Sequence, residues 1–85
     1  MTPRKLLARL GSGALHNVSF SDMAGLVEAL GFHLGRINGS HHIFIHTEIP
    51  ELLNMQNVSG QAKPYQIRQF LRLLERYNMI LENDR

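Results

Sequence analysis

The sequence predicts a single α+β domain, in which a three-stranded antiparallel sheet carries two helices on one face and a short extra helix comes first. Apolar residues recur at helical spacing near both ends of the chain and alternate with polar residues in its middle. The alternating segments follow one another with short connections, which favours an antiparallel meander. A sheet with one apolar face needs a layer packed against it, and the two longer helices supply that layer. With 85 residues the chain can form one core but not two.

Composition and charge narrow the classes of function. The chain has no cysteine, which excludes disulfides, thiolate catalysis and cysteine-ligated zinc. Its apolar runs fall short of the roughly 18 residues of a membrane span, and no apolar segment follows the charged N-terminus as in a secretory signal. These features favour a cytoplasmic protein without membrane contact. The formal net charge of +2 is compatible with a polyanionic partner but does not require one.

A short first helix is expected to begin at Thr2-Pro3 and to end at Gly11-Ser12-Gly13. Threonine can cap a helix, and proline at the first helical position loses no hydrogen bond. Leu6, Leu7 and Leu10 fall on one face of this helix. We expect the helix to dock loosely on the rest of the domain, or to serve as a partner-binding arm.

The two longer helices carry the main apolar faces. One is expected to run from a Ser19 cap, with Ser21 as the alternative cap, to Gly31, and the other from Lys63-Pro64 to about Met79. Their apolar faces consist of Met23, Leu26, Val27 and Leu30 in the first and of Ile67, Phe70, Leu71 and Leu74 in the second. Each face has the width that packing against a sheet requires.

Three strands are expected at Phe32 to Ile37, within His42 to His46, and at Glu51 to Gln56, followed by a loop from Asn57 to Ala62. Asn38-Gly39 is a dipeptide typical of a two-residue hairpin turn, because both central residues of such a turn need a positive φ. The order of helix, three strands and helix (α-β-β-β-α) is the architecture of a double-stranded-RNA-binding domain.

The predicted turn sets the pairing of the first two strands. A two-residue turn at Asn38-Gly39 pairs Arg36 with His41. The further pairs are Leu34 with Ile43 and Phe32 with Ile45. Directly opposite residues share a face of the sheet, so these four apolar residues are expected to face the helices. His42, Phe44 and His46 are expected to point to the other face, where His42 would meet solvent.

His41 is the best candidate for chemistry, because histidine titrates near neutral pH and this one follows a rigid turn. As a general base in RNA cleavage, its imidazole would remove the proton of a 2′-hydroxyl, which then attacks the adjacent phosphate. Arg36, if it lies opposite His41, would hold that phosphate through two hydrogen bonds. The alternative is a polar hairpin tip on which both side chains are only solvated.

Further cations are candidates for phosphate binding. Lys63 precedes the last helix, where a cation opposes the helix dipole but suits a bound phosphate, and Gly60 would help to frame that site. Arg68, Arg72 and Arg76 recur every four residues along the same helix. This stripe would track phosphates, receive an acidic partner protein, or simply be a solvated face.

A metal site is not expected. His42 and His46 share a face of the predicted strand but lie roughly 13 Å apart at the strand rise, too far for one zinc ion. The sequence offers no carboxylate or thiol cluster that would complete a ligand set, so no metal and no cofactor are predicted.

Part of the chain resembles a known family. The motif consists of Arg36-x-x-Gly39-Ser40-His41-His42-Ile43-Phe44, preceded by Leu30-Gly31-Phe32 and followed by Lys63-Pro64-Tyr65-Gln66-Ile67-Arg68. It resembles the HicA family of bacterial toxins over roughly Val18 to Tyr77. The resemblance divides the single domain, residues 1–85, into an N-terminal extension (1–17), a HicA-like core (18–77) and a tail (78–85).

The resemblance implies a fold and an activity. HicA toxins resemble double-stranded-RNA-binding domains with a nuclease site, and they are mRNA interferases whose required histidine corresponds to His41. The resemblance implies metal-independent cleavage of mRNA that leaves a 2′,3′-cyclic phosphate. Gly39, Ser40 and Lys63 match further motif positions, and Lys63, Ser40, His42 or His41 itself would donate the proton to the leaving oxygen.

The resemblance also implies a partner, a HicB antitoxin that blocks the histidine and represses the shared operon. Two departures bear on these expectations. The N-terminal extension adds residues 1–17 ahead of the helix at which shorter family members begin. The stretch Asn54 to Asn57 lacks the proline and basic residues that many members carry, which predicts a weaker grip on RNA. The second candidate function is a non-catalytic RNA-binding or partner-binding module of the same fold.

Overall fold

The computed structural model describes residues 1–81, which form three helices and a four-stranded sheet. The helices are α1 (Pro3–Gly11), α2 (Phe20–Ala29) and α3 (Pro64–Arg76), and the strands are β1 (His33–Asn38), β2 (His41–His46), β3 (Ile49–Val58) and β4 (Gln61–Ala62). The strands pair antiparallel in the order β1-β2-β3-β4. The predicted α+β fold class, similar to a double-stranded-RNA-binding domain, is confirmed, although the sheet has four strands and not three.

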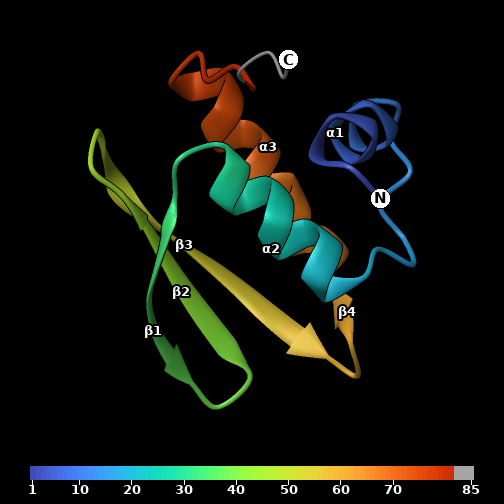
Figure 1. The fold of residues 1–85 in the computed structure, drawn as a ribbon, viewed down its shortest axis with the longest axis horizontal. Coiled ribbons are helices and arrows are strands. Elements are labelled where there is room, and N and C mark those ends of the chain that lie inside the picture. The colour runs from blue at the N-terminus through green and yellow to red at the C-terminus, as the bar shows by residue number, and fades with distance from the viewer. Residues whose placement is uncertain (82–85) are drawn as a thin grey trace.

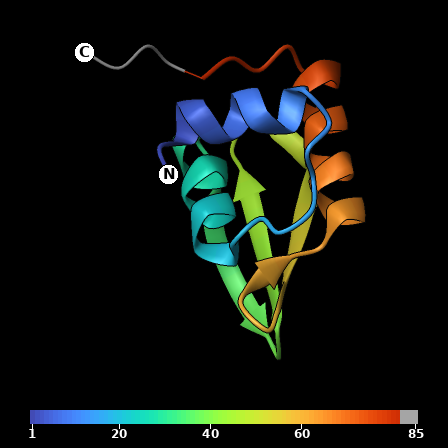
Figure 2. The same cartoon turned by 90° about the vertical axis from the view of Figure 1, so that its right-hand side faces the viewer.

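The helices lie on one side of the sheet. Figure 1 shows α2 and α3 next to each other over one face, and no element of residues 1–81 covers the other. We call this uncovered side the open face. In Figure 2, α1 lies across the helix layer on the side away from the sheet. The domain therefore has a single core between the sheet and the helices, and one sheet face is left in solvent.

Helix α1 docks firmly, so the expectation of loose docking is wrong. Thr2 caps it as predicted, because its hydroxyl oxygen accepts the Lys5 N–H at 3.2 Å. Leu6 and Leu10 are each only 1% exposed and belong to the same core cluster as the apolar residues of α2. A nine-residue helix is too short to be stable alone in water, so these buried leucines are what hold α1 in place.

Helices α2 and α3 largely follow their predictions. Ser19, and not Ser21, caps α2: its hydroxyl accepts the Asp22 N–H at 3.0 Å. Helix α3 ends at Arg76, three residues before the predicted end, and its buried residues are Gln66, Ile67, Phe70 and Leu73. Leu71 and Leu74 are only partly buried. The buried stripe of α3 is therefore rotated slightly from the predicted one, and it includes a glutamine.

The β1–β2 turn lies one residue later than predicted. Gly39 and Ser40 form the turn, and Asn38 pairs with His41 at the ends of the strands. Of these residues only Gly39 has a positive φ, of 62°. Asn38 therefore stays in the strand, and the predicted Asn38-Gly39 turn is wrong. A single left-handed residue is enough here, and glycine adopts that conformation without steric cost.

The register of β1 against β2 also differs from the prediction. Arg36 pairs with Ile43 and not with His41, and a bulge at Gly35 shifts the register beyond it. Farther from the turn, Leu34 pairs with Phe44 and His33 with Ile45. The predicted pairs Leu34–Ile43 and Phe32–Ile45 are therefore wrong. A bulge adds one unpaired residue to one strand, which periodicity alone does not reveal.

The two faces of β2 are the reverse of the predicted ones. Phe44 is 1% exposed and points to the helices, whereas Ile45 is 41% exposed. His42 and His46 share the Phe44 face: the His42 ring lies 4.6 Å from the Phe20 ring, and the His46 ring 5.1 Å from the Phe32 ring. The face with Ile43 and Ile45 has more apolar residues, which is why the sequence pattern favours it. The buried Phe44 side chain, together with the ring contacts of His42 and His46, instead fills the space beneath the helices.

Strand β3 is longer than predicted, and a fourth strand follows it. Leu53 and Met55, each 1% exposed, face the core as expected. The segment 57–62, predicted to be a loop, consists of the end of β3, a tight turn at residues 59–60 and the two-residue strand β4. The Asn57 side-chain oxygen accepts the Gly60 N–H at 2.8 Å and closes this turn. The new strand leads directly into α3.

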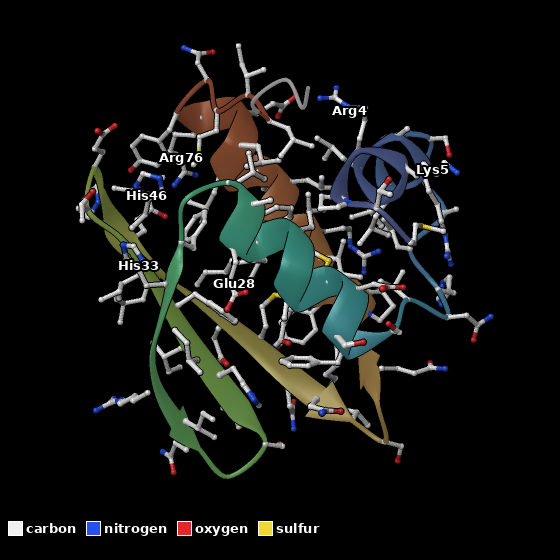
Figure 3. The ribbon with its side chains drawn as sticks, in the orientation of Figure 1. Arg4, Lys5, Glu28, His33, His46 and Arg76 are labelled. Atoms are coloured by element: carbon white, nitrogen blue, oxygen red, sulfur yellow. The ribbon has the colours of Figure 1, made fainter. Side chains whose placement is uncertain are left out.

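A polar cluster joins the end of α3 to β3. Arg76 and the Tyr77 hydroxyl both donate to Oε2 of Glu51, at 2.6 and 2.8 Å. The hydrogen bonds from Tyr77 and Arg76 lower the pKa of the Glu51 carboxyl, and the hydrogen bond with that carboxylate raises the pKa of Tyr77. Figure 3 shows Arg76 near this end of the helix. The cluster attaches α3 to the sheet at the end opposite to β4.

Substitutions on β2 test the corrected faces. We expect Phe44→Ala to lower the free energy of unfolding by about 3–5 kcal/mol, because it leaves a cavity in the core. The neighbouring Ile45→Ala should cost less than about 1 kcal/mol, because its side chain already meets solvent. Urea denaturation of both variants measures the difference. A larger loss for Ile45→Ala than for Phe44→Ala would restore the originally predicted face.

The Glu51 cluster predicts a pH dependence of stability. Because folding lowers the pKa of Glu51, its stabilising contribution is present above the unfolded value of 4.5 and is lost as the pH falls through the folded pKa. Glu51→Gln should therefore lower Tm at neutral pH and reduce the fall of Tm on acidification. Glu28→Gln, at an exposed position on α2, is the matched control and should leave the pH profile unchanged. Parallel profiles for Glu51→Gln and the parent would contradict this role.

Candidate active site

His41 stands at the start of β2, on the open face of the sheet. The next residue, His42, and the buried Phe44 face the helices, so His41 and Ile43 point the opposite way. Across the sheet His41 pairs with Asn38 on one side and with Gln56 on the other. Its side chain is half-buried. The imidazole is therefore supported by neighbouring strands and remains accessible from solvent.

The ring of His41 is anchored by a side chain of the neighbouring strand. Its Nδ1 lies 3.1 Å from Oδ1 of Asn54 on β3. Asn54 pairs with Ile43, two residues along the strands from the His41–Gln56 pair, so it lies on the same face as His41 and reaches the imidazole diagonally. With Nδ1 engaged in this bond, Nε2 is the ring nitrogen left for a substrate.

The turn before His41 is tied to β3. The Asn57 N–H donates to the Ser40 carbonyl at 2.9 Å, and the Gln56 side-chain amide donates to the Ser40 hydroxyl at 3.1 Å. Gly39 and Ser40, both predicted to belong to the site, thus lie directly beside His41. These bonds fix the position of the turn relative to the sheet, so the hairpin tip does not depend on its own two residues for rigidity.

A buried glutamine supports β3 at the level of His41. Gln66 of α3 is 1% exposed, and its Oε1 accepts the Gln56 N–H at 2.6 Å. It occupies the place where β4 would otherwise continue to pair with β3. Sequence analysis did not identify Gln66 or Asn54. The helical spacing of Gln66 to Phe70 and Leu73 places it on the buried face and was the available signal.

Arg36 lies on the same open face as His41 but not opposite to it. It pairs with Ile43, two pairs farther from the turn than Asn38 and His41, and therefore on the same face. The side chain is exposed. A long side chain reaches diagonal neighbours on one face of a sheet, so Arg36 and His41 can contact the same ligand.

His42 is turned away from this face, so its expected contact with solvent is wrong. Its ring packs against Phe20 of α2, and its Nδ1 lies 3.3 Å from the Ser40 carbonyl. His42 therefore contributes to the packing of the hairpin against α2. It is the less suitable of the two adjacent histidines for reaching a substrate on the open face.

The remaining predicted cations lie farther from His41. Lys63 directly precedes α3, and its Nζ lies 5.6 Å from the centre of the Tyr65 ring. Continuing the β3–β4 register by one residue brings the Lys63 backbone level with Gln56, about 10 Å from β2 at the usual strand spacing. Arg68 and Arg72 are exposed on α3, which covers the opposite face. The sheet separates them from His41.

Residues 1–81 contain neither a metal-ligand cluster nor a membrane-spanning helix. No group of three or more His, Cys, Asp or Glu in this part of the chain is arranged to hold a metal ion. No helix of the described residues is long and apolar enough to cross a bilayer.

Gly39 offers a test of the turn that positions His41. An alanine at its φ of 62° is strained, and we expect Gly39→Ala to lower the free energy of unfolding by about 1–2 kcal/mol. Gly25 in α2 has open space around it, so Gly25→Ala should raise the free energy of unfolding by about 0.5–1 kcal/mol through helix propensity. Urea denaturation measures both. Equal effects of the two substitutions would argue against the left-handed turn.

Comparison with known proteins adds the identity of the family. The family model described as HicA toxin of bacterial toxin–antitoxin systems matches residues 20–75. The match runs from the start of α2 through the sheet to the last turn of α3, and leaves α1 outside. No curated protein and no solved structure matches the chain. Because the family match covers more than half of the chain and includes the hairpin with His41, the protein belongs to the HicA toxin family and is the toxin of a toxin–antitoxin pair.

Proposed function

We propose that this toxin is a metal-independent endoribonuclease that cleaves mRNA, with His41 as the general acid–base group. The observation that carries the proposal is the placement of His41. Its half-buried ring stands on the open face, anchored at Nδ1, with the exposed Arg36 on the same face. A positioned imidazole beside a guanidinium is suited to the cleavage of a phosphodiester.

The proposed reaction needs one proton removed and one supplied. His41 Nε2 takes the proton of the ribose 2′-hydroxyl, and the 2′-oxygen forms a bond to the adjacent phosphorus. The bond from phosphorus to the 5′-oxygen of the next nucleotide breaks, and this oxygen receives a proton. The products are a 2′,3′-cyclic phosphate and a 5′-hydroxyl end. Acid–base catalysis by a placed side chain contributes about 10²–10⁴-fold to such a rate.

We assign the stabilisation of the negative charge that develops on the phosphate to groups near the hairpin. Arg36 offers a guanidinium on the open face, and Gly39 and Ser40 offer the turn beside His41. Lys63 is proposed to contact the RNA backbone farther across the sheet. Arg68 and Arg72, on the helix side, are proposed to bind flanking phosphates outside the cleaved bond.

The donor of the second proton is chosen among the nearby groups by accessibility. His42 packs against Phe20 and is the least suited of the four candidates. Lys63 lies about two strand spacings from His41, or roughly 10 Å. Ser40 is adjacent in sequence, but its hydroxyl, which accepts a hydrogen bond from the Gln56 amide, is a far weaker acid than an imidazolium. We favour His41 itself, which holds the abstracted proton after the first step and can return it to the leaving oxygen.

The proposed protein partner is an antitoxin of the HicB type that covers His41. The open face has no cover within residues 1–81, so a partner can reach the site without displacing a part of this chain. The proposed location is the cytoplasm, where both mRNA and such a partner would be found.

The test is cleavage of RNA by the purified chain in the presence of EDTA, with His41→Ala alongside. We expect the parent to cut RNA and leave cyclic-phosphate ends, and His41→Ala to be slower by about 10²-fold or more. His16→Ala, at an exposed position outside the sheet, is the control and should cut at the parental rate. End-group analysis of the products identifies the chemistry.

Three outcomes would contradict the proposal. Cleavage that EDTA abolishes would contradict independence from metal. Equal rates for the parent and His41→Ala would remove His41 from the chemistry. Binding of RNA without cleavage by either protein would favour the second candidate, a non-catalytic RNA-binding or partner-binding module of this fold.

A further inference from the structure

Asn54 contacts the proposed catalytic histidine. Its Oδ1 lies 3.1 Å from His41 Nδ1. An amide oxygen has lone pairs but no hydrogen, so the shared hydrogen must be on the imidazole nitrogen. We propose that Asn54 is a positioning residue that holds His41 in the Nδ1–H tautomer and leaves the lone pair of Nε2 free to act as the base. The catalytic part of this inference rests on the proposed function; the tautomer does not.

The acceptor is held on a rigid part of the sheet. Asn54 lies between Leu53 and Met55, each 1% exposed in the core, and its backbone pairs with Ile43. Two residues beyond Asn54 on β3, the Gln56 N–H donates to the buried Gln66 side chain. The backbone of Asn54 therefore cannot shift along or away from β2 without disturbing core contacts. A fixed acceptor fixes the plane of the ring as well as its tautomer.

The choice of tautomer matters because the two ring nitrogens are not equivalent here. Nδ1 is directed to β3, so a substrate on the open face meets Nε2. A neutral imidazole in water prefers to carry its hydrogen on Nε2, which would leave no lone pair at that position. A hydrogen bond from Nδ1 reverses this preference, as in other sites where a partner orients a catalytic histidine.

An amide also differs from the carboxylate that often fills this position. A carboxylate attracts the charged imidazolium and raises the pKa of the histidine that it contacts. The Asn54 oxygen accepts the hydrogen bond without a net charge, so it orients the ring without favouring the protonated form as strongly. Replacing the amide by a carboxylate should therefore shift the pH dependence of cleavage, which a purely structural role of Asn54 would not predict.

The first experiment measures the tautomer without RNA. Nitrogen NMR chemical shifts of the His41 ring distinguish the Nδ1–H from the Nε2–H form at a pH where the ring is neutral. We expect the Nδ1–H form to dominate in the parent and in Asn54→Asp, which keeps an acceptor. Asn54→Val, which fits a strand but has no acceptor, should shift the ring to the Nε2–H form. Asn38 pairs with His41 from the other side, on β1. Asn38→Ala is therefore the matched control and should leave the tautomer unchanged.

The second experiment measures RNA cleavage by the same proteins across pH. We expect Asn54→Val to cleave roughly ten- to hundredfold more slowly than the parent, the usual loss when the partner of an oriented histidine is removed. Asn54→Asp should retain cleavage but need a higher pH, because the carboxylate raises the pKa of the base. Thermal unfolding of each variant shows whether the fold is intact.

The outcomes separate this inference from the proposed function. If the parent cleaves RNA and Asn54→Val retains both its rate and its Nδ1–H tautomer, the positioning role is wrong and the nuclease stands. If the parent does not cleave, the nuclease is wrong, and the NMR measurement alone decides whether Asn54 holds the ring. If Asn54→Val is unfolded, Asn54→Asp decides: an unchanged pH profile would overturn the inference.

Discussion

The burial of Phe44 between the sheet and the helices is the constraint on which the arrangement of the hairpin depends. Side chains alternate along a strand, so once Phe44 points to the helices, His42 must point with it and His41 must point away. A shift of β2 by one residue would bury His41 and expose Phe44. The position of the candidate catalytic group is thus set by the packing of an aromatic ring three residues away.

Local signals in the sequence were sufficient for the helices and for the fold class. Thr2 and Ser19 cap their helices as predicted, because a cap depends only on residues within one turn. The hairpin was harder, since its pairing depends on the competition between two faces. The face with Ile43 and Ile45 has more apolar residues, but the burial of Phe44 and the contact of the His42 ring with Phe20 of α2 join elements far apart in sequence. The firm docking of α1 through Leu6 and Leu10 is likewise a tertiary contact that periodicity does not predict.

The candidate site likewise contains residues that the sequence identifies and residues that only the three-dimensional structure shows. His41 stands in a motif shared with a family, so the sequence identified it directly. Arg36 shares a face with His41 as predicted, but that face is the open one and not the one toward the helices, and Arg36 pairs two residues farther along β2 than expected. Asn54 and Gln66 contribute to the site only through contacts across strands and across layers. Such contacts depend on the three-dimensional register, and a single sequence specifies register less clearly than it specifies helical faces.

The face of the sheet toward the helices contributes most to stability, whereas the open face carries the residues of the proposed chemistry. Phe44, Leu53 and Met55 face the helices, where a lost side chain leaves a cavity. His41 and Asn54 stand on the open face, where a substitution removes polar contacts but little buried apolar area. The exception is the turn, because the Ser40 carbonyl and hydroxyl also hold the hairpin to β3. A change on the open face can therefore alter the chemistry of His41 while the fold remains, whereas a change at the turn acts on both.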